Sequence, residues 1–99
     1  MNLVKLVLAT IFACTPVLSF ADTVSFSLCN KYGTGAKNVV VKDKKNGMSK
    51  LFQGSIARDV CVTIGAYSSD GKFGEVEITV EQGTPYGVPW IAPGDTVDF

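Results

Sequence analysis

Three glutamates in one short segment come closest, in type and spacing, to a catalytic arrangement. In residues 72–81, apolar residues alternate with Glu75, Glu77 and Glu81, the pattern of a β-strand with one solvated face. On such a strand Glu75 and Glu77 stand about 6.6–7 Å apart, a spacing found between the carboxyl groups of inverting glycosidases. Exposed carboxylates are also the ordinary outer face of an antiparallel strand. We therefore expect a solvated face here and no catalytic residue.

The residues that most catalytic and metal sites need are missing from the chain. It contains no histidine, which excludes Ser-His-Asp and Cys-His catalysis, zinc sites built on imidazole, and blue-copper sites. It has no phosphate-binding glycine loop, and Asp70-Gly71-Lys72 lacks the spaced acids of a calcium loop. Nine basic and nine acidic residues give zero net charge, which argues against a general nucleic-acid binder. We expect a protein that is not an enzyme and has no metal or cofactor.

The proline-rich segment 84–94, TPYGVPWIAPG, offers candidate ligand-binding residues in Tyr86 and the only tryptophan, Trp90. A stiff loop that presents aromatic side chains could stack on a sugar ring or anchor a protein partner. A single tryptophan in a small β-sandwich often fills the core instead. We favour a core position for Trp90, and Tyr86 stays undecided.

Five lysines cluster in residues 37–50 and form a basic stretch. Lys42 and Lys44 share an outward-facing parity and are candidate ligand-binding residues for lipopolysaccharide, an acidic glycan or an acidic partner. Lysines on a solvated hairpin also block strand-to-strand aggregation, and we favour that interpretation.

The first 21 residues are typical of a secretory signal peptide. Lys5 precedes an apolar run of about 15 residues, too short for a spanning helix, and the segment ends with Ser19-Phe20-Ala21. Cleavage after Ala21 would leave residues 22–99 as one domain in the periplasm or outside the cell. In the alternative, Cys14 in a lipobox-like sequence would carry a lipid anchor.

Two cysteines, Cys29 and Cys61, remain after such cleavage, and an oxidising compartment would pair them. A loop of about 33 residues closed in this way contributes roughly 3–4 kcal/mol. In the alternating pattern, each cysteine lies on the strand face opposite to the face that carries the apolar residues. Regular strands would place the bridge on the outer face of neighbouring strands, whereas a bulge at either cysteine would place it between two sheets.

Period-two alternation runs through residues 22–99 and predicts seven short strands. The pattern is typical of an all-β fold, a small antiparallel β-sandwich that is immunoglobulin-like or a partly open barrel. The predicted strands are residues 23–29, 38–44, 48–53, 57–65, 72–81, 88–91 and 96–99. In residues 57–65, Val60, Val62 and Ile64 are expected to face inward.

Two turn signals join these strands. Asn46-Gly47 predicts a two-residue type I′ turn, which would place Asp43 opposite Lys50 and Val41 opposite Phe52. A two-residue turn at Asp70-Gly71 would instead place a core residue opposite a surface one. A longer loop or a bulge is therefore expected between Tyr67 and Phe73.

The charges of residues 22–99 are segregated along the chain. Residues 22–58 carry a net charge of +5 and residues 59–99 a net charge of −6. We expect the lysine face and the glutamate face on opposite sheets, which would make the molecule a dipole that associates head-to-tail at low salt. If the two faces lie on neighbouring strands, the charges pair within one molecule.

Residues 93–99, PGDTVDF, resemble the P-G-D-T-V-x-F segment of cupredoxins over seven residues. The resemblance implies a Pro-Gly turn that enters a strand with Val97 and Phe99 inward. Copper chemistry does not carry over, because the chain has no histidine. An alternating C-terminal strand and one disulfide are also similar to chaperone–usher pilins.

Together these patterns favour a small exported, non-enzymatic binding module for a protein or glycan ligand. An inhibitor of an extracellular hydrolase that inserts the 84–94 loop into a cleft is the alternative. A structural or fimbrial-type subunit is the third hypothesis.

Overall fold

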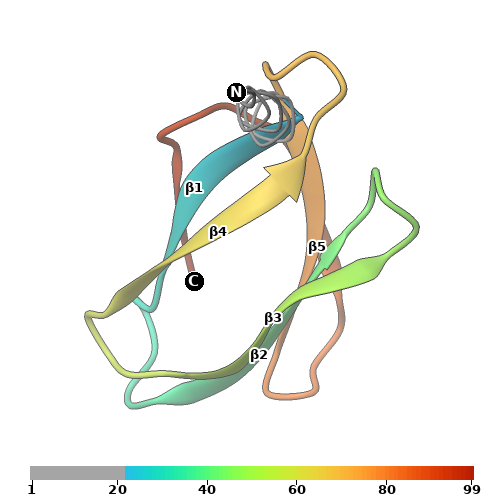
Figure 1. Ribbon diagram of the computed structural model, residues 1–99. Helices are drawn as coiled ribbons and strands as arrows, with labels where there is room; N and C mark the ends of the chain where they lie inside the picture. The colour runs from blue at the N-terminus through green and yellow to red at the C-terminus, as the bar shows by residue number, and fades with distance from the viewer. Residues whose placement is uncertain (1–21) are drawn as a thin grey trace, which may run out of the picture.

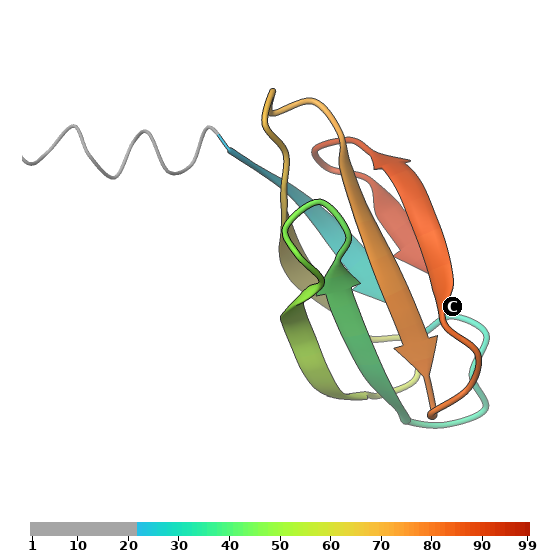
Figure 2. The same cartoon turned by 90° about the vertical axis from the view of Figure 1, so that its right-hand side faces the viewer.

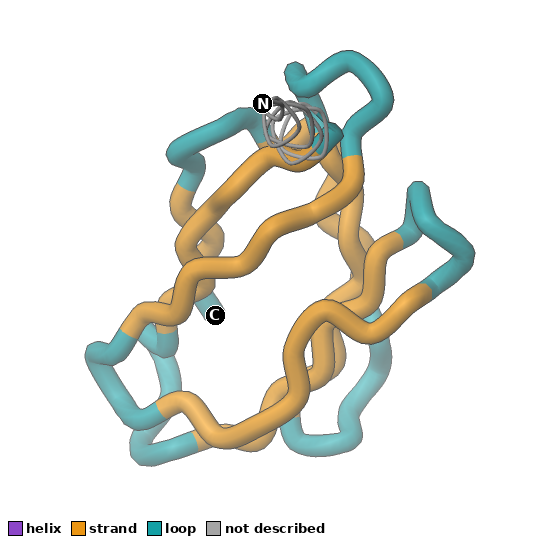
Figure 3. Tube along the Cα trace, viewed as in Figure 1, coloured by secondary structure: helices purple, strands orange, loops and turns teal. Residues whose placement is uncertain are grey.

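A computed structural model of the chain describes residues 22–99. The predicted signal peptide, its cleavage after Ala21 and the alternative lipidation of Cys14 lie outside the described residues. Between residues 22 and 99 the structure is all-β, with seven strands and no helix (Figures 1 and 3). The strands are β1 (Thr23–Cys29), β2 (Lys37–Asp43), β3 (Ser49–Ile56), β4 (Cys61–Tyr67), β5 (Gly74–Val80), β6 (Tyr86–Ile91) and β7 (Thr96–Asp98).

The strands form two sheets that pack as a sandwich, which confirms the predicted fold class. One sheet has the order β4-β1-β7, and the other has the order β3-β2-β5-β6. All neighbours are antiparallel except β1 and β7, which run parallel. Figure 1 shows β1 beside β4 in one layer and β2 beside β3 in the other, and Figure 2 shows β5 beside β2.

The core lies between the sheets and follows the predicted alternation. Val24, Phe26 and Leu28 of β1 are buried, and the residues between them are more exposed. Burial of such side chains contributes about 1.5–3 kcal/mol each. Val97 and Phe99 pack against the core as expected. The other buried apolar residues are Val39, Val41, Ile56, Ile64, Ala66, Val76, Ile78 and Ile91.

The inward position expected for Val60 is wrong, since its side chain is exposed. β4 begins only at Cys61. Val60 lies in a tight turn in which its N–H donates to the Ala57 carbonyl (3.1 Å), and Asp59 has a positive φ of 63°. Because of this turn, the alternation of β4 starts only at Cys61 and does not include Val60.

The β2–β3 hairpin agrees with only half of its predicted register. Val41 lies opposite Phe52 as predicted, but a bulge after Val41 places Asp43 opposite Ser49, so the predicted pairing with Lys50 is wrong. The positive φ values fall on Gly47 and Met48, one residue later than a two-residue turn at Asn46-Gly47 requires. The connection therefore spans residues 44–48.

The β4–β5 connection, residues 68–73, is the longer loop that the sequence predicts, and it crosses from one sheet to the other. Asp70 organises it. Its Oδ1 accepts hydrogen bonds from the Lys72 N–H and from the Ser68 hydroxyl, both at 2.9 Å. Both donors stabilise the ionised carboxylate and hold the pKa of Asp70 below its usual value, and the Lys72 N–H has the larger effect.

The disulfide Cys29–Cys61 forms as predicted. The two cysteines are direct register partners on β1 and β4, strands of the same sheet. Their neighbours Leu28 and Val62 pack toward the core, and Cys61 is exposed. Of the two placements left open by the sequence, the outer-face bridge is therefore the one observed.

Candidate functional site

A β-bulge in edge strand β6 controls the position of Trp90. Val88 lies opposite Val76 and Ile91 lies opposite Gly74, so Pro89 and Trp90 together face the single residue Glu75. Tyr86 and Val88 lie opposite core residues, so regular alternation would turn Trp90 inward as well. The extra residue in the bulge gives the inward position to Ile91 instead. Ile91 is 2% exposed and Trp90 is 73% exposed. The predicted core position of Trp90 is therefore wrong.

The same register shows that most of the segment 84–94 is a strand, so the stiff loop expected there is wrong, whereas the strand predicted over residues 88–91 is confirmed within β6. Residues 86–91 form β6 and pair with β5. Pro89 fits an edge strand at a bulge because it has no N–H to donate to a neighbouring strand. Trp90 has a φ of 60°, which is unusual for a bulky residue and costs roughly 1–3 kcal/mol.

Phe73, which directly precedes β5, supports the exposed indole. The ring centroids of Phe73 and Trp90 are 5.8 Å apart with an interplanar angle of 88°, an edge-to-face contact. Beside Trp90 lies a small hollow of about 90 Å³, lined by Lys45, Glu75, Pro89 and Trp90. We call Trp90, Phe73, Pro89, Lys45 and Glu75 the Trp90 surface.

Polar groups of the β2–β3 turn border this surface. The Lys45 Nζ donates to the Phe73 carbonyl at 3.2 Å. The Lys44 Nζ lies 3.5 Å from Glu75 Oε2 and 3.3 Å from where a Cβ on Gly87 would stand. Gly87 thus lets the Lys44 side chain lie close over β6. Lysine and carboxylate groups therefore offer both hydrogen-bond donors and acceptors beside the indole.

The four predicted ligand-binding residues are only partly brought together. Lys44 borders the Trp90 surface through Glu75, whereas Lys42 lies opposite Glu77 on β5 and Lys50 on β3. Tyr86 lies opposite the buried Ile78, on the other side of the bulge from Trp90. Its side chain is 41% exposed, and desolvation of the covered part raises the pKa of its hydroxyl. Whether these side chains bind a ligand stays a prediction.

The expected separation of the lysine and glutamate faces onto opposite sheets is wrong. β2 and β5 are neighbours in one sheet, with Lys42 directly opposite Glu77. Two strands separate them in sequence, but β3 pairs on the far side of β2 and β4 lies in the other sheet. The opposite charges thus lie side by side, and the premise for head-to-tail association is absent.

The row of three glutamates is also shorter than predicted. Glu75 and Glu77 lie on β5, but β5 ends at Val80 and Glu81 has a φ of 51°. The Glu81 Oε2 accepts a hydrogen bond from the Asn38 N–H at 2.6 Å. Glu81 therefore ties the end of β5 to β2, and does not extend the row of carboxylates.

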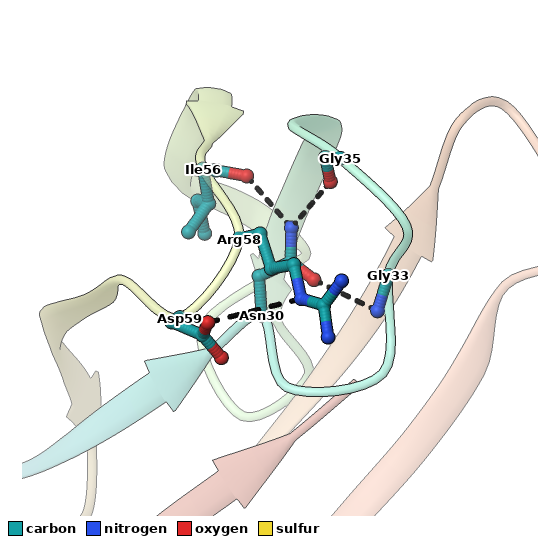
Figure 4. Close-up of polar contacts among 6 residues, drawn as sticks. All are labelled: Asn30, Gly33, Gly35, Ile56, Arg58 and Asp59. Carbon is teal, nitrogen blue, oxygen red and sulfur yellow. Dashed lines mark hydrogen bonds and ion pairs between the residues drawn. The ribbon is translucent and has the colours of Figure 1, made fainter.

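Sequence reasoning missed Phe73 and Asn30. Phe73 stands between glycines in a turn segment, Gly71-Lys72-Phe73-Gly74, and an aromatic residue in a turn was the available signal. Asn30 is fully buried where β1 ends (Figure 4). Its Nδ2 donates to the carbonyls of Gly35 and Ile56, both at 2.9 Å, and its Oδ1 accepts from the Gly33 N–H at 3.0 Å. All these groups are satisfied, so Asn30 is structural.

A larger hollow, of about 340 Å³, lies next to Asn30 over the disulfide. Lys31 and Asp98 stand on its rim, 4.0 Å apart. The Lys31 ammonium also lies 5.9 Å from the centre of the Tyr32 ring, which is 72% exposed. These rim charges are compensated within the molecule, and the other lining residues are Cys29, Asn30, Asp59, Cys61 and Thr96.

No helix within residues 22–99 combines the length and hydropathy needed to cross a membrane. In that part of the chain, no three His, Cys, Asp or Glu side chains are grouped so that they could hold a metal ion. Comparisons with protein-family models, with curated proteins and with solved structures found no match to this chain.

Proposed function

We propose that the protein is a small exported, non-enzymatic binding module that contacts its ligand through the Trp90 surface. The observation that carries this proposal is the position of Trp90. The only tryptophan of the chain is 73% exposed, at a positive φ, in a bulge that gives the core position to Ile91. Backbone strain of this kind concentrates at functional sites, and tryptophan is prominent among residues that dominate binding energy.

The support of the indole favours a binding role over accidental exposure. Phe73 contacts Trp90 edge-to-face, and the Lys45 side chain holds the Phe73 carbonyl. Three segments distant in sequence, from the β2–β3 turn, the β4–β5 loop and β6, thus meet at one end of the sheet (Figure 2). A side chain whose neighbours restrict it loses less conformational entropy when a ligand binds.

Export is supported by the signal-peptide pattern of residues 1–21 and by the Cys29–Cys61 disulfide. Disulfides form and persist in oxidising compartments outside the cytosol. An exported protein would therefore meet its ligand in the periplasm or at the cell surface.

The test is capture of ligand from periplasm and culture medium by immobilised protein. Trp90→Ala removes the contact residue. Tyr32→Ala is the matched control, because Tyr32 is as exposed as Trp90 but lies outside the Trp90 surface, in the segment that follows β1. We expect the wild type and Tyr32→Ala to retain the same ligand and Trp90→Ala to lose it. Equal retention by Trp90→Ala would refute the proposed site.

A further inference from the structure

An exposed indole such as that of Trp90 is suited to a ligand with a flat face that carries C–H groups. Phe73 meets the indole at 88°, and the tryptophan remains 73% exposed, so most of the indole is open to solvent. The electron-rich face of an aromatic ring attracts the positively polarised edge of a partner group. The axial C–H groups on one face of a pyranose ring provide such an edge, while its hydroxyl groups point outward.

The groups next to the indole suit those hydroxyls. Lys45 donates one hydrogen bond to the Phe73 carbonyl, and an ammonium group has three donors, so two remain. Glu75 supplies carboxylate acceptors in the same hollow, although one oxygen also faces the Lys44 ammonium. A sugar hydroxyl both donates and accepts, so it can use the two kinds of group together.

The size and charge of the site separate a sugar from other ligands. The hollow of about 90 Å³ is well below the roughly 300–1,000 Å³ of pockets that enclose a whole small ligand, so it has room for only part of one sugar ring. The core of a protein interface is depleted of charged residues, whereas Lys45 and Glu75 line this hollow. A nucleic acid would need a predominantly basic surface, whereas here the ammonium group of Lys44 lies beside Glu75, and Lys42 lies opposite Glu77.

We infer that the Trp90 surface binds one pyranose ring of a saccharide, with the ring stacked on the Trp90 indole and its hydroxyls on Lys45 and Glu75. This inference rests on the proposed binding function and names its ligand class. A neutral sugar and an acidic one share the stacking contact. The nearby lysines would add attraction only for the acidic sugar.

Trp90 is the only tryptophan in the chain, so its fluorescence reports directly on the site. The purified protein is titrated with tri-N-acetylglucosamine, maltotriose and trigalacturonate, and acrylamide quenching is followed. We expect at least one saccharide to shift the emission saturably and to protect Trp90 from the quencher. No saturable protection by any of the three would overturn the pyranose assignment.

Variants then separate stacking from a general surface effect, with saturation-transfer NMR of the sugar protons as the readout. Trp90→Ala should weaken binding about tenfold or more; Trp90→Phe should restore part of it, and Tyr32→Ala should bind like the wild type. Binding of trigalacturonate alone that survives Trp90→Ala and disappears with added salt would overturn stacking in favour of the lysines. If no saccharide binds but Trp90→Ala still abolishes ligand capture from the culture medium, this inference fails and the proposed function stands.

Discussion

The Asp43 carboxylate accepts a hydrogen bond from the backbone N–H of Tyr67 at 2.7 Å and so joins β2 of one sheet to β4 of the other. Its second oxygen accepts from the Lys45 N–H at 3.0 Å. Asp43 is 1% exposed, so this carboxylate is a buried cross-link between the sheets. It also shapes the turn that carries Lys44 and Lys45 to the Trp90 surface.

Replacing Asp43 by alanine should therefore destabilise the fold. The N–H groups of Tyr67 and Lys45 would lose their acceptor, and a buried donor left unpaired costs about 1–3 kcal/mol. Urea unfolding measures the difference, with Asp98→Ala as the control because its ion pair with Lys31 is partly exposed. Equal stability of the Asp43→Ala variant and the wild type would show that the buried carboxylate does not join the sheets.

Gly33 and Gly35 provide a matched test of the Asn30 network. A Cβ on Gly33 would stand 2.4 Å from the Asn30 Oδ1, whereas a Cβ on Gly35 would meet nothing within 4 Å. Gly33→Ala should lower the free energy of unfolding by about 1–3 kcal/mol, because Asn30 must move and lose hydrogen bonds. Gly35→Ala should change it little. Similar effects of the two substitutions would contradict the structure around Asn30.

The disulfide predicts the result of a thiol titration. A protein that contains Cys29 and Cys61 but not Cys14 should not react with a thiol reagent under denaturing, non-reducing conditions. Replacing both cysteines by alanine should lower the free energy of unfolding by roughly 2–4 kcal/mol, because the unfolded chain is no longer cross-linked. Two equivalents of reactive thiol in the unreduced protein would disprove the pairing.

The β4–β5 loop should respond to pH through Asp70. Its pKa is lowered in the folded protein from the usual 3.8, so ionised Asp70 stabilises the fold above that value. This stabilisation is lost as the pH falls through the lower, folded pKa. Asp70→Asn should be slightly less stable than the wild type at pH 6, and the difference should disappear once the pH falls below the folded pKa of Asp70. A difference in stability between Asp70→Asn and the wild type that stays the same from pH 6 to a pH below the folded pKa would contradict this role.

Alternation alone predicts most of the fold, because burying one face of each strand requires a period of two. It places Val24, Phe26 and Leu28 in the core and Val41 opposite Phe52, as observed. It fails where a bulge adds a residue, at Leu51 of β3 and at Pro89-Trp90 of β6, because one extra residue reverses the parity of the rest of the strand. Local sequence does not mark these bulges clearly.

The candidate site was harder to predict because it depends on which strands are neighbours. Lys44 and Glu75 are 31 positions apart, and they meet only because β2 and β5 pair. Phe73 meets Trp90 because β5 pairs with β6, and Lys45 meets Phe73 because β2 pairs with β5. Aromatic and lysine segments could be recognised in the sequence one by one, but their meeting at one end of the sheet is a property of the strand order.

The native fluorescence of Trp90 tests whether the β6 bulge turns the only tryptophan out of the core and into a binding surface. An exposed indole should be freely quenched by acrylamide in the folded protein, and its emission maximum should barely move when urea unfolds the chain. In parallel, Trp90→Ala should cost little stability, while Ile91→Ala should cost about 2–5 kcal/mol. A blue-shifted, poorly quenched native emission that moves to the red on unfolding would place Trp90 in the core and refute the proposed binding surface.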